Sequence, residues 1–442
     1  MSECAICTDP FHKTRKAVGC PRCPHQACSR CVKTFLLKNT VEPRCMSCNA
    51  PWDMDFVRRN LSKSFLDSGY KKHQISTLVS RAEASLGNLQ RFVPIKTRIV
   101  ALQEEIRIVQ LEKKSSERNK RIRMLQEEKR GLQVRWDTEP AAITSTSSEE
   151  PVETFFMACP LKNCRGRVSS DHQCGLCEHW VCRDCHADRG LERNGPHECR
   201  KEDKETVDKL KENTKHCPEC HEGIFKEHGC DQMWCTRCHT CFSWKTGQKE
   251  HGRIHNPHYF EHMFQQNGGG GGVRNVVHND IHGFPAYNLL VRKWARQFLP
   301  EHQDFLHDLH RLVNHLRYED LDRLRESIAH HEAREQQRWG VEYLRQKISR
   351  EAWGQKLYLA YRKTQRMQEM HDILQTVVVV TCDLYQRWFY NEIHGAELIV
   401  SLRTLLADSN ENIMAHNKRF GTKALLVDPH RELAQHILDV NV

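Results

Sequence analysis

The chain has 442 residues, of which 28% are charged and 38% hydrophobic, and its formal net charge is +10 at pH 7. This length exceeds one ordinary domain and predicts three or more folded units. The longest uncharged apolar stretch runs from Ile373 to Cys382, far short of the ~20 residues of a membrane-spanning helix. No basic start followed by an apolar run is visible at the N-terminus, so we expect no signal peptide, no membrane segment, and a cytoplasmic or nuclear location.

Cysteine is concentrated in the first part of the chain. Of 22 cysteines, 21 lie at or before Cys241. Sixteen form Cys-x2-Cys pairs, namely Cys4/Cys7, Cys20/Cys23, Cys28/Cys31, Cys45/Cys48, Cys174/Cys177, Cys182/Cys185, Cys217/Cys220 and Cys235/Cys238. In a chain of this size for which we expect no signal peptide, such pairs indicate metal rather than disulfides, because each offers two thiolates to Zn²⁺ and a second pair completes a tetrahedron. The sequence therefore predicts a modular zinc protein of a reducing compartment.

The first cluster occupies an expected domain of residues 1–60 and contains the first four pairs. It resembles a RING finger, in which the first and third pairs share one zinc ion and the second and fourth share the other. His25 could replace Cys20 or Cys23 as a ligand; we favour the two cysteines because their Cys-x2-Cys geometry is already complete.

Two other residues of this domain bear on partners. Ile6 lies between the first two ligands, where RING fingers commonly present an apolar residue to a ubiquitin-conjugating enzyme, although a core role is equally compatible. Asn49 follows the last ligand, where many RING ligases carry an arginine that supports direct transfer. The absence of this arginine thus favours transfer of ubiquitin through a cysteine of the ligase over direct transfer from the conjugating enzyme.

Residues 61–136 are predicted to be helical, and residues 137–153 have the composition of a flexible linker. Apolar residues step by four, three, four and three, as in a coiled coil, at Ile95, Ile99, Leu102, Ile106 and Val109. The register slips before Ile122, so the pattern is compatible with self-association and with packing inside the same domain. Between Lys96 and Arg135 the net charge is +6, which we interpret as a solvated helix face rather than a phosphate-binding surface.

The second cluster falls in an expected domain of residues 154–202. Its candidate ligands are Cys159, Cys164, Cys174, Cys177, Cys182, Cys185, His197 and Cys199. Their order resembles the in-between-RING domain, which implies two more zinc ions.

The third cluster falls in an expected domain of residues 203–262. Cys217, Cys220, Cys235 and Cys238 complete one tetrahedral site and leave Cys230 unassigned. The run from Lys215 to Trp244 looks like the second RING of the RING-between-RING ubiquitin ligases. The segments GCDQMWC, FSWKTG and HNPHYF are also similar to such proteins encoded by large DNA viruses, whose location would be the host cytoplasm.

The resemblance implies an activity. In such ligases the first RING binds a ubiquitin-charged conjugating enzyme, and a cysteine of the last domain accepts ubiquitin as a thioester before transfer to a substrate lysine. Cys230 matches that position, and a metal-free thiol is the side chain suited to acyl transfer. The alternative is that Cys230 is a spare ligand or a buried thiol.

The last domain departs from the family in two ways. Where many members carry a histidine as general base, this chain has Gln232, which cannot accept a proton; His228 and His239 are nearby candidates. Where two thiolates of a second zinc site are expected, it has Ser243 and Thr246. Either Cys241 combines with His251, His255 or His258 to rebuild that site, or the domain holds a single zinc ion.

A glycine-rich linker of residues 263–274 precedes a predicted helical domain of residues 275–442, in which we find no chemistry-bearing motif. One helical face is formed by Phe305, Leu306, Leu309, Leu312, Val313 and Leu316. The expected fold is thus multidomain, with small mixed α+β zinc domains, a long coiled-coil-like helix and an all-α C-terminal domain.

The sequence is compatible with three functions. The leading hypothesis is a ubiquitin ligase acting through a Cys230 thioester, with a conjugating enzyme, ubiquitin and a protein substrate as partners. The second is a catalytically silent zinc adaptor, favoured by Gln232 and by the altered last zinc site. The third is a basic nucleic-acid-binding zinc protein, which we rank last because no finger has the short spacing that places a reading helix in a groove.

Overall fold

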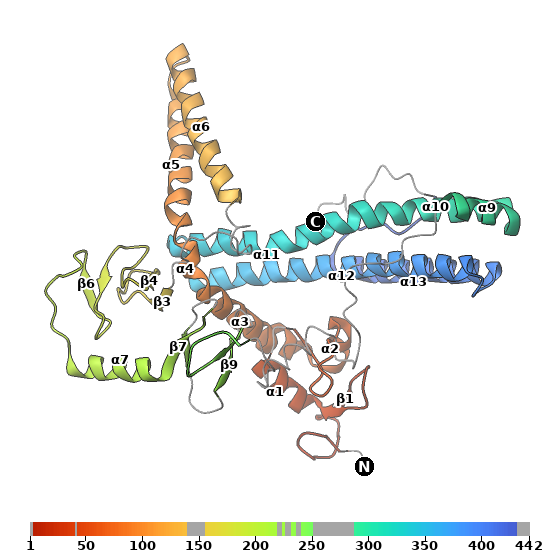
Figure 1. Ribbon diagram of the computed structural model, residues 1–442, viewed down its shortest axis with the longest axis horizontal. Helices are drawn as coiled ribbons and strands as arrows, with labels where there is room; N and C mark the ends of the chain where they lie inside the picture. Colours follow the sequence, from red (N-terminus) through yellow and green to blue (C-terminus); the bar gives the residue numbers. More distant parts are fainter. Residues whose placement is uncertain are drawn as a thin grey trace. The chain divides into compact units, whose positions relative to one another are not determined.

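The computed structural model describes residues 3–39, 42–138, 155–218, 223–225, 231–235, 240–250 and 287–430. The chain divides into two compact units. The first comprises Met1–Val273 with Glu335–Tyr358, and the second Arg274–Arg334 with Leu359–Val442. Across the described ranges helices predominate, and the strands form five two-stranded sheets (Figure 1). None of the helices in these ranges combines the length and the apolarity that a membrane span requires.

The first unit begins with a small cysteine-rich fold. Strand β1 (Ala17–Gly19) pairs antiparallel with β2 (Gln26–Cys28), which leads into α1 (Ser29–Asn39), and α2 (Met54–Asn60) follows. Its buried apolar side chains include Val18, Val32, Leu36, Trp52 and Val57, packed among the cysteines. A core this small depends on additional cross-links for its stability.

A run of helices comes next. A π-helical turn η1 (Phe65–Tyr70) continues into α3 (Lys71–Ala84), and short α4 (Leu86–Leu89) precedes α5 (Phe92–Leu111) and α6 (Ser116–Thr138). Helices α5 and α6 pack side by side as a hairpin (Figure 1).

The hairpin explains the slip in the predicted coiled-coil register. The chain breaks between α5 and α6, where Ser115 Oγ accepts the Arg118 N–H at 3.1 Å. The Arg118 guanidinium donates to the carbonyls of Val109 and Gln110 at the end of α5. Four of the five predicted seam residues are buried, at Ile95, Ile99, Leu102 and Val109. In this chain α5 therefore packs against α6.

Short antiparallel hairpins carry the remaining cysteines. Strand β3 (Phe155–Ala158) pairs with β4 (Arg167–Ser169), and β5 (Trp180–Val181) with β6 (Asp188–Gly190). Helix α7 (Lys201–Asn213) then leads to β7 (Thr214–His216), which pairs with β8 (Gly223–Phe225). The last pair is β9 (Gln232–Trp234) with β10 (Cys241–Ser243).

Two long helices link the units along the chain, α11 (Leu321–Leu344) and α12 (Arg350–Phe389). Their tip, residues 335–358, groups with the first unit. Arg165 donates to the carbonyls of Tyr343 and Ile348, both at 2.8 Å, and its guanidinium lies 4.3 Å from the centre of the Tyr343 ring. The tip is thereby attached to the second cysteine-rich domain.

The second unit consists mainly of helices up to residue 420, with short breaks at residues 298–299 and 390–394. It contains α9 (Tyr287–Gln297), α10 (Pro300–His315), the π-helical turn η3 (Leu316–Asp320) and α13 (Gly395–Phe420), with the outer parts of α11 and α12. The predicted apolar face is buried at all six positions, which are Phe305, Leu306, Leu309, Leu312 and Val313 of α10 and Leu316 of η3. This face joins a core with α12 and α13.

Candidate metal centres

The structure brings the cysteines of the N-terminal fold together in two interleaved sets. One set is Cys4, Cys7, Cys28 and Cys31, and the other is Cys20, Cys23, Cys45 and Cys48. Within each set the sulfur atoms lie within 4.8 Å of one another. The Cys7–Cys28 and Cys23–Cys45 sulfur pairs are 3.8 and 3.7 Å apart, close to the ~3.8 Å edge of a tetrahedron with Zn–S bonds of ~2.3 Å. His25 lies outside the second set and accepts the Cys20 N–H through its backbone carbonyl.

Four Cys-x2-Cys pairs share one backbone turn, which we call a knuckle. The N–H of the first cysteine donates to the carbonyl five residues later, and the N–H four residues later donates back to the carbonyl of that cysteine. The knuckles begin at Cys4, Cys45, Cys174 and Cys182. The fifth residue has φ between 56° and 61° in all four, at Thr8, Asn49, Glu178 and His186.

Asn49 therefore has a local role that the sequence analysis did not identify. Its φ of 56° is left-handed, a conformation that asparagine tolerates better than most residues. The absence of arginine here coincides with a backbone position suited to asparagine.

Electrostatics favour a cation at these sets. Burial by itself raises the pKa of the Cys4 thiol. Hydrogen bonds from the backbone N–H groups of Cys7, Cys28 and Ile6 outweigh this effect and lower the pKa to about 6. In the same set burial raises the pKa of Cys31 to about 12. Thiols packed this closely cannot all ionise together unless a cation compensates them, as Zn²⁺ does for four thiolates.

The second cluster forms two sets in sequential rather than interleaved order. Cys159, Cys164, Cys174 and Cys177 form one, and Cys182, Cys185, His197 and Cys199 form the other. The Cys159–Cys177 and Cys164–Cys174 sulfur pairs are both 3.7 Å apart, and His197 Nε2 lies 2.9 Å from Cys185 Sγ. The donor atoms and their distances fit zinc. The described residues therefore contain four ligand sets that are compatible with zinc.

The third cluster is described only in part. Cys217 and Cys235 are buried, whereas Cys220, Cys230 and Cys238 lie outside the described residues, as do His228, His239, His251, His255 and His258. Cys241 is buried on β10, and burial together with the Glu250 charge raises its pKa to about 11.

Gln232 of β9 contacts a carboxylate. Its Nε2 donates to Glu250 Oε2 at 2.6 Å. Glu250 could not be identified from the sequence, because no spacing rule connects it to Cys230. Pairing of β10 with β9 places Ser243 opposite Gln232, and Glu250 follows seven residues after Ser243.

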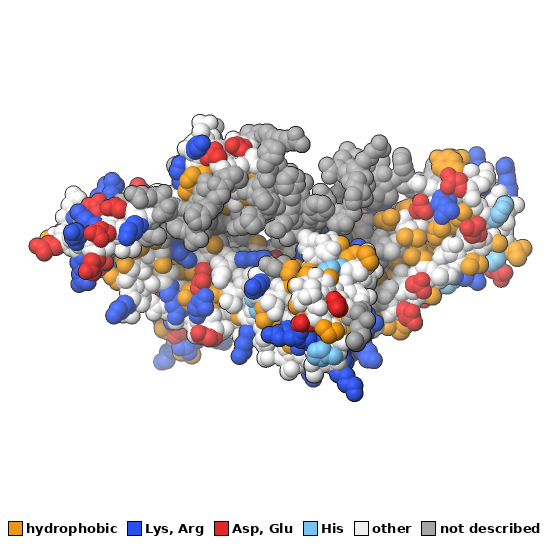
Figure 2. Space-filling view, turned by 90° about the horizontal axis from the view of Figure 1, so that it is seen from below, with side chains coloured by type: hydrophobic (Ala, Val, Ile, Leu, Met, Phe, Trp, Pro, Cys, Tyr) orange, Lys and Arg blue, Asp and Glu red, His pale blue; other side chains and the backbone are white. Residues whose placement is uncertain are grey.

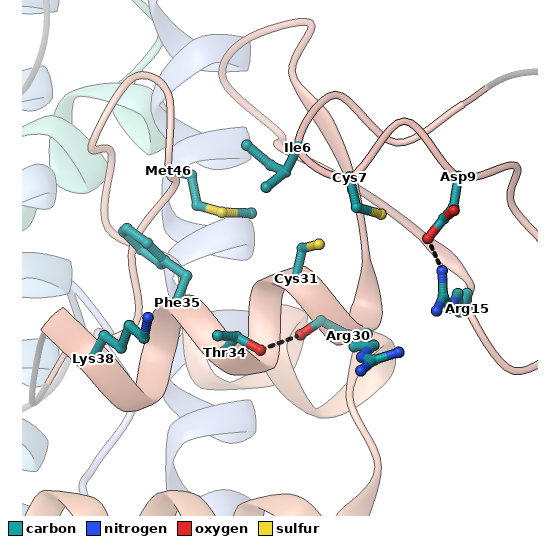
Figure 3. A pocket seen from close by; sticks show the side chains of 10 residues that line it. All are labelled: Ile6, Cys7, Asp9, Arg15, Arg30, Cys31, Thr34, Phe35, Lys38 and Met46. Carbon is teal, nitrogen blue, oxygen red and sulfur yellow. Dashed lines mark hydrogen bonds and ion pairs between the residues drawn. The ribbon is translucent and has the colours of Figure 1, made fainter.

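Ile6 lines a pocket on the N-terminal fold (Figure 3). The side chain is 54% exposed, so the structure places it at the surface rather than in the core. It faces Met46 across the pocket, with Phe35 of α1 beside them. The pocket measures about 450 Å³, and Lys38 and other basic side chains lie at its edge (Figure 3).

Charge is mixed over the surface. On the face drawn in Figure 2, Lys and Arg side chains are interspersed with Asp and Glu over the described residues. Helices α5 and α6 also carry ion pairs, such as Arg98 with Glu128 at 2.8 Å. Some basic side chains of these two helices are therefore paired with acidic ones.

Comparisons with known proteins found distant relatives. The chain matches no protein-family model. It is 35% identical over 126 residues to the uncharacterized protein 073L of Frog virus 3, covering 28% of this chain and 37% of that protein. It is 30% identical over 107 residues to the E3 ubiquitin-protein ligase dbl4 of Schizosaccharomyces pombe, covering 23% and 18%. To the potential E3 ubiquitin-protein ligase ariadne-2 of Caenorhabditis elegans it is 32% identical over 80 residues, 16% of each chain.

These matches span well under half of each relative. They show distant similarity to ubiquitin ligases and to a viral protein.

Proposed function

We propose that this chain is a RING-between-RING-type ubiquitin ligase that carries ubiquitin from a charged conjugating enzyme, through a thioester on Cys230, to a substrate lysine. The observation that carries the proposal is the order of the four metal-ligand sets in the first two cysteine clusters, together with an exposed apolar pocket on the first domain. Zinc, when bound, supplies structural cross-links and takes no part in the transfer. We place this activity in the cytoplasm or nucleus.

The pocket beside Ile6 is the proposed docking site for the conjugating enzyme. Ile6 and Met46 offer apolar area, and Phe35 extends it along α1. Near them Arg15 pairs with Asp9 and lowers the pKa of that carboxyl. An apolar centre with a charged edge is the usual anatomy of a protein–protein interface.

The transfer has two steps. The Cys230 thiolate attacks the thioester carbonyl of the charged enzyme, so a new C–S bond forms and the old one breaks, releasing the enzyme's thiolate. A substrate lysine amine then attacks the new thioester; the C–N bond forms, the C–S bond to Cys230 breaks, and the amine loses a proton.

We assign the acceptance of that proton to Glu250. Gln232 cannot take a proton, but it donates a hydrogen bond to the Glu250 carboxylate, and it follows Cys230 by two residues. The hydrogen bond from Gln232 therefore holds the Glu250 carboxylate beside the segment that follows Cys230, and a carboxylate can act as a general base.

The decisive experiment incubates the chain with activating enzyme, a panel of conjugating enzymes and ubiquitin, with products read on a non-reducing gel. Cys230→Ser is expected to keep its zinc, to stop ligation and to trap ubiquitin as an oxyester that resists reductant but not hydroxide. Glu250→Gln is expected to load ubiquitin normally but to discharge it onto lysine about 100-fold more slowly.

The alternatives make different predictions. A Cys230→Ser protein that ligates at the original rate identifies a direct RING ligase. A wild-type chain that never forms a thioester with any enzyme of the panel identifies an adaptor. Loss of zinc from Cys230→Ser identifies Cys230 as a ligand.

A further inference from the structure

A fifth turn in the first unit has the backbone of a cysteine knuckle but lacks the cysteines. It runs from Ser243 to Gln248. The Ser243 N–H donates to the Gln248 carbonyl at 3.0 Å, and the Gly247 N–H donates to the Ser243 carbonyl at 2.8 Å. Gly247, the fifth residue, has φ 68°. The four cysteine knuckles share these three features, with corresponding bonds of 2.8–3.1 Å.

The flanking strands extend the correspondence. In the knuckles at Cys4, Cys45 and Cys174, the residue before the knuckle bridges the residue six positions after its start, as in Glu3 with Pro10. Phe242 bridges Lys249 in the same way. The turn at Ser243 is therefore a knuckle in its hydrogen bonds, its left-handed residue and its strand pairing.

Hydroxyl oxygens occupy the two ligand positions of this turn. Ser243 stands where the first cysteine would be and Thr246 where the second would be. The Thr246 N–H donates to Ser243 Oγ at 3.2 Å, and the Gln248 N–H donates to Thr246 Oγ1 at 3.3 Å. Cysteine sulfurs accept the same kind of bond elsewhere, as Cys28 Sγ does from the Cys31 N–H at 3.5 Å.

A carboxylate completes the turn. Asp231 Oδ2 accepts the Ser243 hydroxyl at 2.7 Å, and Asp231 Oδ1 accepts the Lys245 N–H at 2.8 Å. The Asp231 carbonyl also accepts the Trp244 N–H at 2.7 Å. These three bonds tie the segment directly after Cys230 to the far side of the hairpin, a cross-link that a metal ion would otherwise provide.

We propose that the Asp231–Ser243–Thr246 network replaces a zinc ion in the last domain, so that this knuckle keeps its fold without metal. Neutral hydroxyls do not fit the ligand set of structural zinc, which is thiolate and imidazole with occasional carboxylate. A carboxylate that accepts one O–H and one N–H supplies charge-assisted hydrogen bonds instead. The inference concerns metal content and local stability, and it stands whether or not Cys230 forms a thioester.

The test combines zinc analysis with hydrogen exchange on the full-length chain. Ser243→Ala, Thr246→Ala and Asp231→Asn are each expected to bind as many zinc ions as the wild type, whereas Cys235→Ser loses one. Asp231→Asn weakens the bond to the Lys245 N–H, so amide exchange in residues 242–249 is expected to rise about tenfold. The matched control Asp171→Asn changes an exposed aspartate elsewhere in the first unit and should alter neither measurement.

Two results would overturn the proposal. One is the loss of a zinc ion from Ser243→Ala, Thr246→Ala or Asp231→Asn, which would identify that residue as a ligand. The other is exchange in residues 242–249 that stays at the wild-type rate in Asp231→Asn and in Ser243→Ala, because the network would then not hold the turn. Zinc loss counts as evidence of a ligand only where hydrogen exchange outside residues 242–249 matches the wild type, because unfolding of the domain would also release zinc from its cysteine site.

Discussion

At the scale of single residues, the N-terminal fold exposes an apolar side chain where burial would be the ordinary outcome. Ile6 is 54% exposed, and Leu37 of α1 is 40% exposed. Only Ile6 lines the described pocket with Phe35 and Met46. A contiguous apolar surface of this kind indicates contact with a partner, whereas a single exposed leucine is common on protein surfaces.

Replacing Ile6 by Ala is expected to weaken binding of a charged conjugating enzyme about tenfold, because three apolar carbons leave the interface. The free energy of unfolding should change by less than about 0.5 kcal/mol, since the Ile6 side chain is largely exposed. Leu37→Ala is the matched control and should leave binding unchanged. Titration by fluorescence anisotropy gives the affinities. An Ile6→Ala variant that folds and binds normally would place the interface elsewhere.

The resemblance to a RING finger implied which pairs of the first cluster lie together, and local spacing identified the Cys-x2-Cys pairs themselves. Neither could predict Asp231 or Glu250. Their contacts with Ser243 and Gln232 depend on the register of β9 with β10. That register is a pairing between strands, which no single-segment pattern encodes.

At the scale of elements, helix α12 approaches α3 closely at Gly354. A Cβ atom added there would lie 2.7 Å from Ile75 Cγ2 and 3.0 Å from Val79 Cγ2. Both neighbours are β-branched and cannot easily rotate away. In contrast, a Cβ at Gly131 of α6 would meet nothing within 4 Å. The two glycines thus form a matched pair, one required for packing and one not.

Gly354→Ala is expected to destabilise the contact of α12 with α3 by about 1–2 kcal/mol, because overpacking outweighs the gain in helix propensity. Gly131→Ala should stabilise α6 by about 0.5–1 kcal/mol. Hydrogen exchange of peptides from α3 and from residues 350–358 reports the first effect. Unchanged exchange in Gly354→Ala would show that α12 does not pack on α3 in solution.

The helices themselves were predictable from their apolar periodicity, but their partners were not. The seam from Ile95 to Val109 was compatible with self-association and with packing inside its own domain, and in the structure α5 packs on α6 after the break at Ser115. The contact of Gly354 with Ile75 joins segments far apart in the sequence. Such long-range contacts depend on the whole fold rather than on local pattern.

At the scale of the whole molecule, the two units differ in what stabilises them. In the described part of the first unit, the N-terminal fold and the second cluster have small cores whose buried members include many cysteines. The second unit has a larger core, which includes Leu, Val, Met, Tyr and Trp side chains. Cys382 is the single cysteine among the described members of that core. Metal should therefore matter for one unit and not for the other.

A strong chelator is expected to unfold the cysteine-rich domains and leave the second unit folded, because binding of structural zinc contributes directly to folding free energy. Hydrogen exchange after chelation should lose protection in residues 3–60 and 155–200, while residues 287–334 and 359–420 keep theirs. Elemental analysis before chelation should give at least four zinc ions per chain, one for each described ligand set. Fewer than four ions, or loss of protection in both units together, would contradict this division, because the second core would then depend on the metal-stabilised domains.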